Sequence, residues 1–423
     1  MIQVFEKSSP DFQRKLDALC NRSSELSPDI EAAARKTIAK VRAGGDAALR
    51  ALTAEFDKRQ LDAIELPAAE WDKLAARVTP EVRAAIEHAA QRVRTFHERE
   101  RHASYEISED GVRVGSRVDP LARIGIYVPG GKARYPSTVI MTAVPARVAG
   151  VREIVMTTPG PSPETLAAAR LAGVDRIFLI GGAQAIAAMA YGTESVPRVD
   201  KIVGPGNAYV AAAKRLVFGD VGIDSIAGPT EVVIAADDGV DPRWIAADLL
   251  AQAEHDELAV PVLIARGKPF AEKVAAAVAA QLADLPRRAI ATKALADQGA
   301  IFVVDSTEDV VRIVNLLAPE HASLALRDAR ALAGQITTAG AVFIGAHTPE
   351  SVGDYVAGPS HVLPTGGSAR FASPLGVSDF IKRTSIIEYD AAALGAQADD
   401  IERIANVEDL FGHGRAVTIR TRG

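Results

Sequence analysis

Only one cysteine, Cys20, occurs in the 423 residues of the sequence. A single thiol excludes a disulfide within the chain and is typical of proteins of the reducing cytoplasm, where we expect this protein to work. Cys20 lies in a charged N-terminal segment without an activating partner, so a thiol nucleophile is not expected. Apolar runs are short as well. None approaches the roughly 18 residues that a membrane span requires, and the N-terminal residues lack the apolar core of a signal peptide.

Positive charge is also scarce in this chain. Lys and Arg number 48 against 54 Asp and Glu, which gives a net charge of −6. Nucleic acids and anionic membranes attract clustered positive charge, so neither is expected as a partner. With 48% hydrophobic and 24% charged residues, the composition is that of a soluble globular protein, and the length suits two large cores.

Two kinds of pattern divide the chain. Residues 1–120 are predicted to be largely helical and highly charged, with Ser27 and Pro28 at the start of one long helical pattern. From about residue 121, short apolar runs such as "VREIVMTT" and "VDRIFLIGG" alternate with helical patterns such as "PETLAAARLA". Strands that alternate with helices predict a parallel sheet with helices packed on its faces.

The alternation comes in two series, at residues 121–230 and 231–375. The second series begins with "EVVIAAD" and includes "AVPVLIA", "AIFVVD" and "GAVFIG". We therefore predict an α/β fold with two successive Rossmann-like parallel-sheet domains. The N-terminal region would pack partly on the second domain, and residues 376–423 would form a small helical C-terminal appendage. No clean sequence repeat relates the two halves.

Glycine-containing loops follow the apolar runs of the first series. They are "VPGGKARYP", "IGGAQA" and "VGPGNAY", and none is a true GxGxxG fingerprint. Tyr127, Gln184 and Asn207 lie where strands are followed by helices, and each can bind or stack on parts of a dinucleotide. Alternatively, these glycines only end strands tightly. The loops leave both interpretations open.

Polar side chains at the end of one helical pattern indicate a metal site. In "LLAQAEHDEL", Gln252 and His255 lie three residues apart and would share one helical face. A long loop rich in Gly, Pro and Ser holds Asp354 and His361, and an acid and an imidazole are adjacent in "APEH". Imidazole and oxygen ligands suit Zn²⁺ or a related divalent ion. Because no compact motif such as HExxH is present, the alternative is a set of hydrogen-bonded, partly buried histidines.

Several long sequence blocks resemble those of the histidinol dehydrogenase family. They are "IYVPGGKARYPSTVIM", "GPGNAYVAAAKR", "GIDSIAGPTEV", "LLAQAEHD", "APEH", "TPESVGDYVAGPSHVLPT" and "DFIKR". They occur in the family's order over roughly residues 120–385, and the tail matches more loosely. The resemblance implies oxidation of L-histidinol through L-histidinal to L-histidine with two NAD⁺, a reaction of histidine biosynthesis.

The resemblance also implies a set of site residues. One Zn²⁺ per subunit would be held by Gln252, His255, Asp354 and His413. Glu320 and His321 would be catalytic, with His321 as the base for the hydroxyl proton and Glu320 activating the water of the second oxidation. NAD would be bound by Tyr127, Gln184 and Asn207. The amino alcohol substrate would contact the zinc ligands together with Thr230, His321, His361 and Glu408.

The family's homodimeric assembly gives the tail a further role. The resemblance implies that the tail of one subunit completes the site of the other, so that Glu408 and His413 act in trans. Domain 121–230 would then bind NAD, and domain 231–375 would bind zinc and substrate.

The chain departs from the family pattern in two places. Thr230 stands where serine is usual, and the neighbours of Glu408 and His413 in "VEDLFGHGRAV" differ. These changes leave open a related zinc- and NAD-dependent dehydrogenase of another polar alcohol, such as a sulfonated diol. The residues are also compatible with a non-catalytic α/β binding protein or with a zinc hydrolase that uses no NAD.

Overall fold

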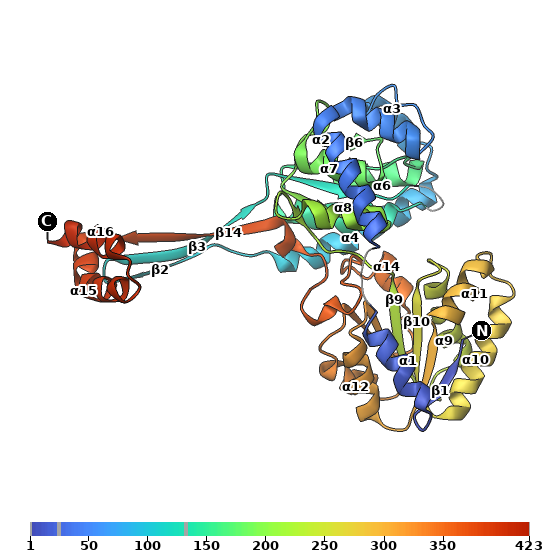
Figure 1. Ribbon diagram of the computed structural model, residues 1–423. Coiled ribbons are helices and arrows are strands. Elements are labelled where there is room, and N and C mark those ends of the chain that lie inside the picture. Colours follow the sequence, from blue (N-terminus) through green and yellow to red (C-terminus); the bar gives the residue numbers. More distant parts are fainter. Residues whose placement is uncertain (1, 23–26, 131–133, 423) are drawn as a thin grey trace.

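Two parallel β-sheets and one antiparallel sheet organise the protein, as the computed structural model shows (Figure 1). The structure describes residues 2–22, 27–130 and 134–422. Each parallel sheet is the centre of an α/β unit, and the antiparallel sheet forms a long arm (Figure 1). The predicted α/β fold with two parallel-sheet domains is thus confirmed. Within the described ranges, no helix has the length and apolarity to cross a bilayer.

The sheet of the first unit has the strand order β6-β5-β4-β7-β8, all parallel. Its strands are β4 (Arg123–Tyr127), β5 (Glu153–Thr157), β6 (Arg176–Phe178), β7 (Lys201–Val203) and β8 (Gly222–Ile223). These strands are mostly apolar and buried on both faces, which explains why they appear in the sequence as continuous apolar runs.

Helices cover both faces of the first sheet. One face carries α3 (Ala68–Ala75), α4 (Pro80–His97), α5 (Pro136–Ala149) and α6 (Pro163–Ala172). The other face carries α2 (Pro28–Phe56), α7 (Gly182–Tyr191) and α8 (Ala208–Val217). Helices α5 and α6 both end at a glycine in the left-handed conformation, Gly150 (φ 94°) and Gly173 (φ 84°). Most of the predicted N-terminal helical region therefore packs on the first unit.

The sheet of the second unit has the order β1-β11-β10-β9-β12-β13 and is also entirely parallel. Its strands are β1 (Val4–Glu6), β9 (Glu231–Ala236), β10 (Val260–Arg266), β11 (Ala300–Val304), β12 (His321–Ala325) and β13 (Ala341–Ile344). Helices α9 (Pro242–Ala253), α10 (Lys268–Leu282) and α11 (Arg288–Asp297) cover one face. The other face carries α1 (Pro10–Cys20), α12 (Thr307–Leu317) and α13 (Ala329–Leu332).

Both parallel sheets share one topology. In each, the first strand of the series lies centrally, the next two strands add on one side, and the last two add on the other. The extra strand β1 extends the second sheet at its edge. In each sheet, strands are therefore added first on one side of the initial strand and then on the other. The reversal creates a topological switch point, which lies between β4 and β7 in the first sheet and between β9 and β12 in the second. The common topology relates two halves that show no clean sequence repeat.

The arm is an antiparallel sheet that extends away from both units (Figure 1). Its strands β2 (Tyr105–Glu109), β3 (Val112–Pro120) and β14 (Ile381–Tyr389) pair in the order β14-β3-β2. The β2–β3 hairpin turns at Asp110 (φ 45°) and Gly111 (φ 78°), a pair of residues that tolerates two successive positive φ angles. The sequence prediction contained no strands in these segments.

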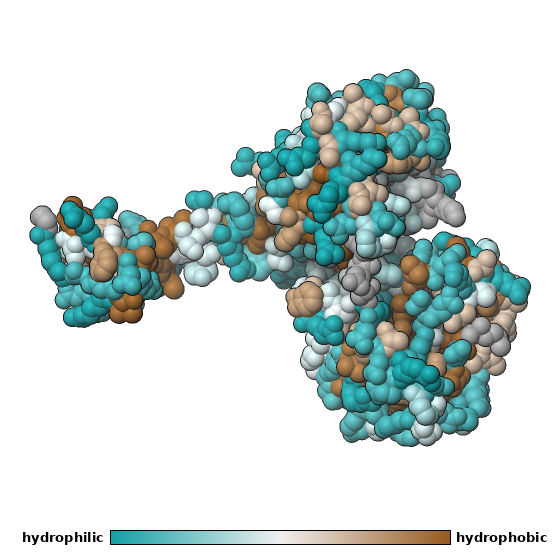
Figure 2. Space-filling view, in the orientation of Figure 1, coloured by the Kyte–Doolittle hydropathy of each residue, from teal (hydrophilic) through white to brown (hydrophobic). Residues whose placement is uncertain are grey.

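The tip of the arm consists of two helices, α15 (Ala391–Val407) and α16 (Phe411–Thr421), which pack on each other. This confirms the expected helical C-terminal end. Apolar surface is visible along the arm and its tip in Figure 2. The exposed apolar side chains at the tip are Ile404, Val407, Leu410, Phe411 and Ile419.

Candidate active site

A cavity of about 470 Å³ is lined by residues of both α/β units. The first unit contributes Gly204 and Pro205, which follow β7 at the carboxyl edge of its sheet. The second unit contributes Thr230 and His321, which lie at the amino edge of its sheet. Ligands of open α/β sheets usually bind beyond the carboxyl ends of strands, so the second unit departs from this rule.

Glu320 is buried between the end of α12 and the start of β12. Helix α12 ends because Ala318 adopts the left-handed conformation (φ 45°) and Pro319 follows it. The Thr230 hydroxyl donates to Glu320 Oε2 at 2.7 Å, and the backbone N–H of Glu231 donates to the same oxygen at 3.0 Å. Burial raises the pKa of Glu320 to about 8, although the two hydrogen bonds oppose this shift.

His321 is the first residue of β12 and is buried beside Glu320. Its Nδ1 lies 2.9 Å from the backbone carbonyl oxygen of Glu231. A carbonyl can only accept, so this contact assigns the proton to Nδ1 and leaves the lone pair on Nε2. Burial lowers the pKa of His321, and the nearby carboxylates oppose this only in part. The ring is therefore a neutral imidazole with a free basic nitrogen.

A buried ion pair between Arg22 and Glu231 holds the backbone next to Glu320 and His321 in place. Arg22 donates from Nε to Glu231 Oε1 at 2.6 Å and from Nη2 to Glu231 Oε2 at 2.7 Å. Arg22 also donates to the carbonyl of Leu317 at 2.8 Å, at the end of α12. The Gly366 N–H adds a third donor to Glu231 at 3.0 Å. Arg22 thus joins the start of β9 to the segment that carries the catalytic candidates.

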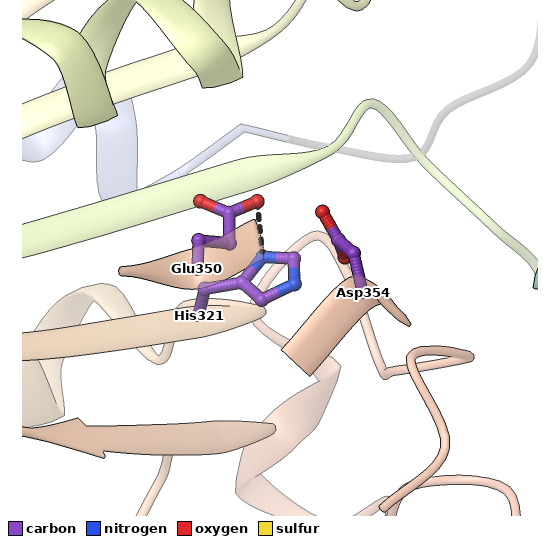
Figure 3. A group of neighbouring side chains, drawn as sticks. All are labelled: His321, Glu350 and Asp354. Atoms are coloured by element: carbon purple, nitrogen blue, oxygen red, sulfur yellow. Dashed lines mark ion pairs between the residues drawn. The ribbon is translucent and has the colours of Figure 1, made fainter. Parts of the chain in front are cut away.

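Helix α14 (Glu350–Tyr355) brings two more carboxylates to His321, as Figure 3 shows. Glu350 Oε1 lies 3.5 Å from His321 Nδ1. Asp354 follows one helical turn later, and one ligand atom each from His321, Glu350 and Asp354 lie within 4.8 Å of one another. Burial raises the pKa of Glu350 well above its usual value, with Asp354 as the next cause, and burial also raises that of Asp354.

Sequence reasoning missed Glu350. The signal was present in "PESVGDY", where two acids lie four residues apart and so share a face on any helix. The segment is too short to give a clear helical pattern, because α14 has only six residues.

Gln252 and His255 lie at the end of α9. The helix ends at Ala253, so His255 is beyond it and not on the expected helical face. His255 lines the cavity, and its pKa is lowered mainly by desolvation, with Asp354 opposing this effect. Gln252 is 0% exposed, and neither its amide oxygen nor its nitrogen has a hydrogen-bond partner among the described residues.

The residues present fit a divalent metal ion. A buried amide without partners costs free energy, so Gln252 indicates a partner outside the described residues. Gln252, His255 and Asp354 offer an amide oxygen, an imidazole and a carboxylate, and these donor types suit Zn²⁺ or a similar ion. His255 and Asp354 both line the cavity.

His361 also lines the cavity. Desolvation by the surrounding protein lowers its pKa to about 4, so the ring is neutral at physiological pH. It lies in the loop after α14, and its contact with the substrate stays a prediction from the resemblance.

Tyr127, Gln184 and Asn207 lie near the carboxyl edge of the first sheet. Tyr127 ends β4, and its hydroxyl oxygen accepts from the Gly182 N–H at 3.1 Å. Gln184 is buried in the first turn of α7, while Asn207 caps α8 by accepting from the N–H groups of Tyr209 and Val210 at 3.1 Å. In the loop "VPGGKARYP", residues 131–133 lie outside the described part of the chain.

The loop between β7 and α8 requires a glycine where it meets β4. Gly204 has φ +114°, and a Cβ atom there would lie 2.2 Å from the carbonyl oxygen of Tyr127. Its N–H donates to Asp224 Oδ2 at 2.7 Å, and Lys214 donates to its carbonyl at 3.1 Å while also pairing with Asp224. The buried Lys214–Asp224 ion pair thus holds the loop between β7 and α8 at the switch point of the first sheet.

Glu408 and His413 are not brought to the cavity of their own chain. They lie at the C-terminal end of α15 and in α16, and both are exposed on the tip of the arm. Figure 1 shows this tip well separated from both α/β units. By contrast, one cavity is lined by six predicted site residues: Thr230, His255, Glu320, His321, Asp354 and His361.

Two Rossmann-like units with acid–base groups in the cleft between them form a dehydrogenase-type scaffold. A family model described as histidinol dehydrogenase matches residues 20–421. The chain is 49% identical to a histidinol dehydrogenase of Geobacter metallireducens, over 98% of this chain and 97% of that protein. It is 47% identical to one of Aquifex aeolicus, over 99% of both chains.

A crystal structure of histidinol dehydrogenase from Elizabethkingia anophelis is similar with a TM-score of 0.93. The two are 36% identical, and the match covers 99% of this chain and 98% of that one. The chain belongs to the histidinol dehydrogenase family, a family of NAD-dependent oxidoreductases. The resemblance inferred from the sequence blocks is confirmed.

Proposed function

We propose that the protein oxidises L-histidinol through L-histidinal to L-histidine, with two NAD⁺ and one zinc ion per subunit. The observation that carries this proposal is the pairing of two neighbouring bases with distinct hydrogen bonds. His321 is held as a neutral imidazole with a free Nε2, and Glu320 is a buried carboxyl with a raised pKa. Two bases with separate environments suit two successive oxidations.

Gln252, His255 and Asp354 would hold the zinc ion, with His413 of a second copy as the fourth ligand. The partnerless amide of Gln252 supports this set. Zinc would supply Lewis acidity and a template for the alcohol. His321, Glu350 and Asp354 are a competing cluster, but a metal on His321 would occupy the nitrogen that the reaction needs as a base.

Domain 121–230 would bind NAD, and domain 231–375 would bind zinc and substrate. Tyr127, Gln184 and Asn207 are proposed to contact the cofactor, which would accept the hydride. Their position near the switch point of the first sheet supports this assignment.

The residues of the cleft would then divide the proton transfers. His321 Nε2 takes the hydroxyl proton of the alcohol, because its Nδ1 proton is held by the Glu231 carbonyl. Glu320 accepts a proton from the water that adds to the aldehyde, and Thr230 keeps its carboxyl in place through the 2.7 Å hydrogen bond. Thr230 and His361 would also contact the substrate. Burial raises the pKa of the Cys20 thiol, so a thiohemiacetal is not part of this scheme.

A homodimer would complete the site. Glu408 and His413 would reach the partner's cleft, because an arm that leaves both units cannot serve its own. The exposed apolar residues of the arm tip support a second copy of this chain as the surface that covers them. We place the enzyme in the cytoplasm, in keeping with its single cysteine.

A substrate panel tests the proposed function. With purified enzyme, L-histidinol is expected to yield two NADH per molecule consumed, measured by absorbance, and L-histidine as the product, measured by chromatography. A sulfonated diol is expected to yield none. NADH from the sulfonated diol alone would assign the chain to a different polar alcohol, and no NADH from any alcohol would indicate a binding protein.

A further inference from the structure

The backbone of Glu231 hydrogen-bonds to both proposed bases. Its N–H donates to Glu320 Oε2 at 3.0 Å, and its carbonyl oxygen lies 2.9 Å from His321 Nδ1. Strands β9 and β12 pair in the sheet, with His321 opposite Val232, the residue after Glu231. The positions of both bases therefore depend on where the backbone of this one residue lies at the start of β9.

The side chain of Glu231 holds that backbone through a bidentate ion pair. Its two carboxylate oxygens accept from Nε and Nη2 of Arg22 at 2.6 and 2.7 Å, an arrangement that fixes direction as well as distance. Water screens the pair little, because only 16% of the Arg22 side chain and 2% of the Glu231 side chain are exposed. The Gly366 N–H also donates to Oε1 at 3.0 Å, and Gly366 lies in the loop that carries His361.

Arg22 connects three segments that are distant in the sequence. It lies two residues beyond α1, and its Nη1 donates to the carbonyl of Leu19 near the end of that helix. Its Nη2 donates to the carbonyl of Leu317, the last residue of α12, at 2.8 Å. Leu317 precedes Glu320 by three residues. Arg22 therefore holds the segment that carries the two bases both through the end of α12 and through Glu231.

We propose that Arg22 and Glu231 are positioning residues for both oxidations, although neither is among the described residues that line the cavity. This inference rests on the proposed function and deepens it, because it attributes the alignment of the two bases to one buried ion pair. A base acts only within hydrogen-bond reach of the proton that it removes, and a displacement of about 1 Å can cost about 10²-fold in rate. A looser ion pair should therefore slow both steps without removing any group that touches the substrate.

The Arg22→Lys and Glu231→Gln variants test the proposal. Lysine keeps the charge but cannot form two parallel hydrogen bonds, and glutamine keeps the backbone groups of Glu231 but replaces one acceptor oxygen with a donor. Each variant should lower single-turnover NADH formation from L-histidinol and from L-histidinal by about 10- to 100-fold. The dissociation constant of L-histidinol, measured by calorimetry without NAD⁺, should stay within about twofold of the wild type. Because the variants loosen the pair from opposite sides, either one that folds is sufficient for the test.

A double-mutant cycle separates positioning from a general loss of structure. In a His321→Asn background, alcohol oxidation no longer depends on where that base lies, so Arg22→Lys should lower its rate by no more than about twofold. In a Glu320→Gln background, the same result is expected for the oxidation of L-histidinal. If Arg22→Lys cost as much in these backgrounds as in the wild type, Arg22 would act independently of the two bases and the proposal would be wrong. Unchanged rates in Arg22→Lys and Glu231→Gln would also contradict it.

Arg176→Lys is the matched control. Arg176 donates from Nε and Nη2 to the two carboxylate oxygens of Glu65 at 2.9 and 2.7 Å, and its Nη2 also donates to the carbonyl of Ser195 at 3.2 Å. This pair has the same geometry but lies at β6 of the first unit, and neither partner lines the cavity. The control should lower the melting temperature while both rates stay within about twofold of the wild type.

Equal rate losses in Arg22→Lys and Arg176→Lys would attribute the effect to stability and overturn the proposal. Failure of the proposed function is a separate result, since it would appear as wild-type enzyme that forms no NADH from L-histidinol.

Discussion

The His321→Asn variant is expected to lose about 10²- to 10⁴-fold in the rate of alcohol oxidation, the usual contribution of a general base. Asparagine can still offer an N–H to the Glu231 carbonyl, so the local hydrogen bond of 2.9 Å has a replacement. It has no basic nitrogen to take the hydroxyl proton. The effect is measured as single-turnover NADH formation from L-histidinol.

Metal content separates this explanation from a ligand role for His321. The variant is expected to retain wild-type zinc, because the proposed ligands Gln252, His255 and Asp354 are intact. Loss of zinc would instead favour the cluster in which His321, Glu350 and Asp354 hold the ion.

The Glu320→Gln variant is expected to lose most in the second oxidation, again by about 10²- to 10⁴-fold. Glutamine can accept the hydrogen bond from Thr230 but cannot accept a proton from the attacking water. The measurement is NADH formation from L-histidinal, compared with NADH from L-histidinol in a single turnover. Equal losses in the two steps would contradict the division of roles between Glu320 and His321.

The pH dependence of the second step follows from the same residue. Burial raises the pKa of Glu320 to about 8, and the base is the ionised form. Its population therefore grows as the pH rises, so the rate of aldehyde oxidation should increase up to about pH 8 and then level off. The Glu320→Gln variant should lack this rise.

The α/β units were predictable from the sequence because of how their strands are buried. All six residues of β9, for example, are buried, because helices cover both faces of the sheet. A strand of this kind appears in the sequence as a mostly apolar run. The common strand order of the two sheets was not available from these runs, since pairing between strands depends on contacts distant in sequence.

The arm could not be predicted in the same way. Strands β3 and β14 are partly or largely exposed, and they pair across more than two hundred residues. Neither strand therefore needs the apolar alternation that marks a half-buried strand. The one local signal was the pair Asp110 and Gly111, which is typical of a tight hairpin turn.

The residues of the candidate site were predicted from the resemblance to the family more than from their spacing in the sequence. Thr230, Glu320 and Asp354 are far apart in the sequence and meet only because β9, β12 and α14 converge on one cleft. Glu350 was missed because a helix of six residues has no readable period. Glu408 and His413 are exposed at the tip of the arm, so their predicted roles in the site depend on the proposed second copy of the chain.

A subunit-mixing experiment tests the central claim most directly, which is that one cleft and the arm of a second copy form each site. His413→Ala and His321→Asn chains are unfolded together in equal amounts, refolded and assayed with L-histidinol. Half of the dimers would be mixed, each with one intact site, so about one quarter of wild-type activity is predicted. Activity no higher than that of either variant refolded alone, in mixtures shown to contain mixed dimers, would contradict the claim.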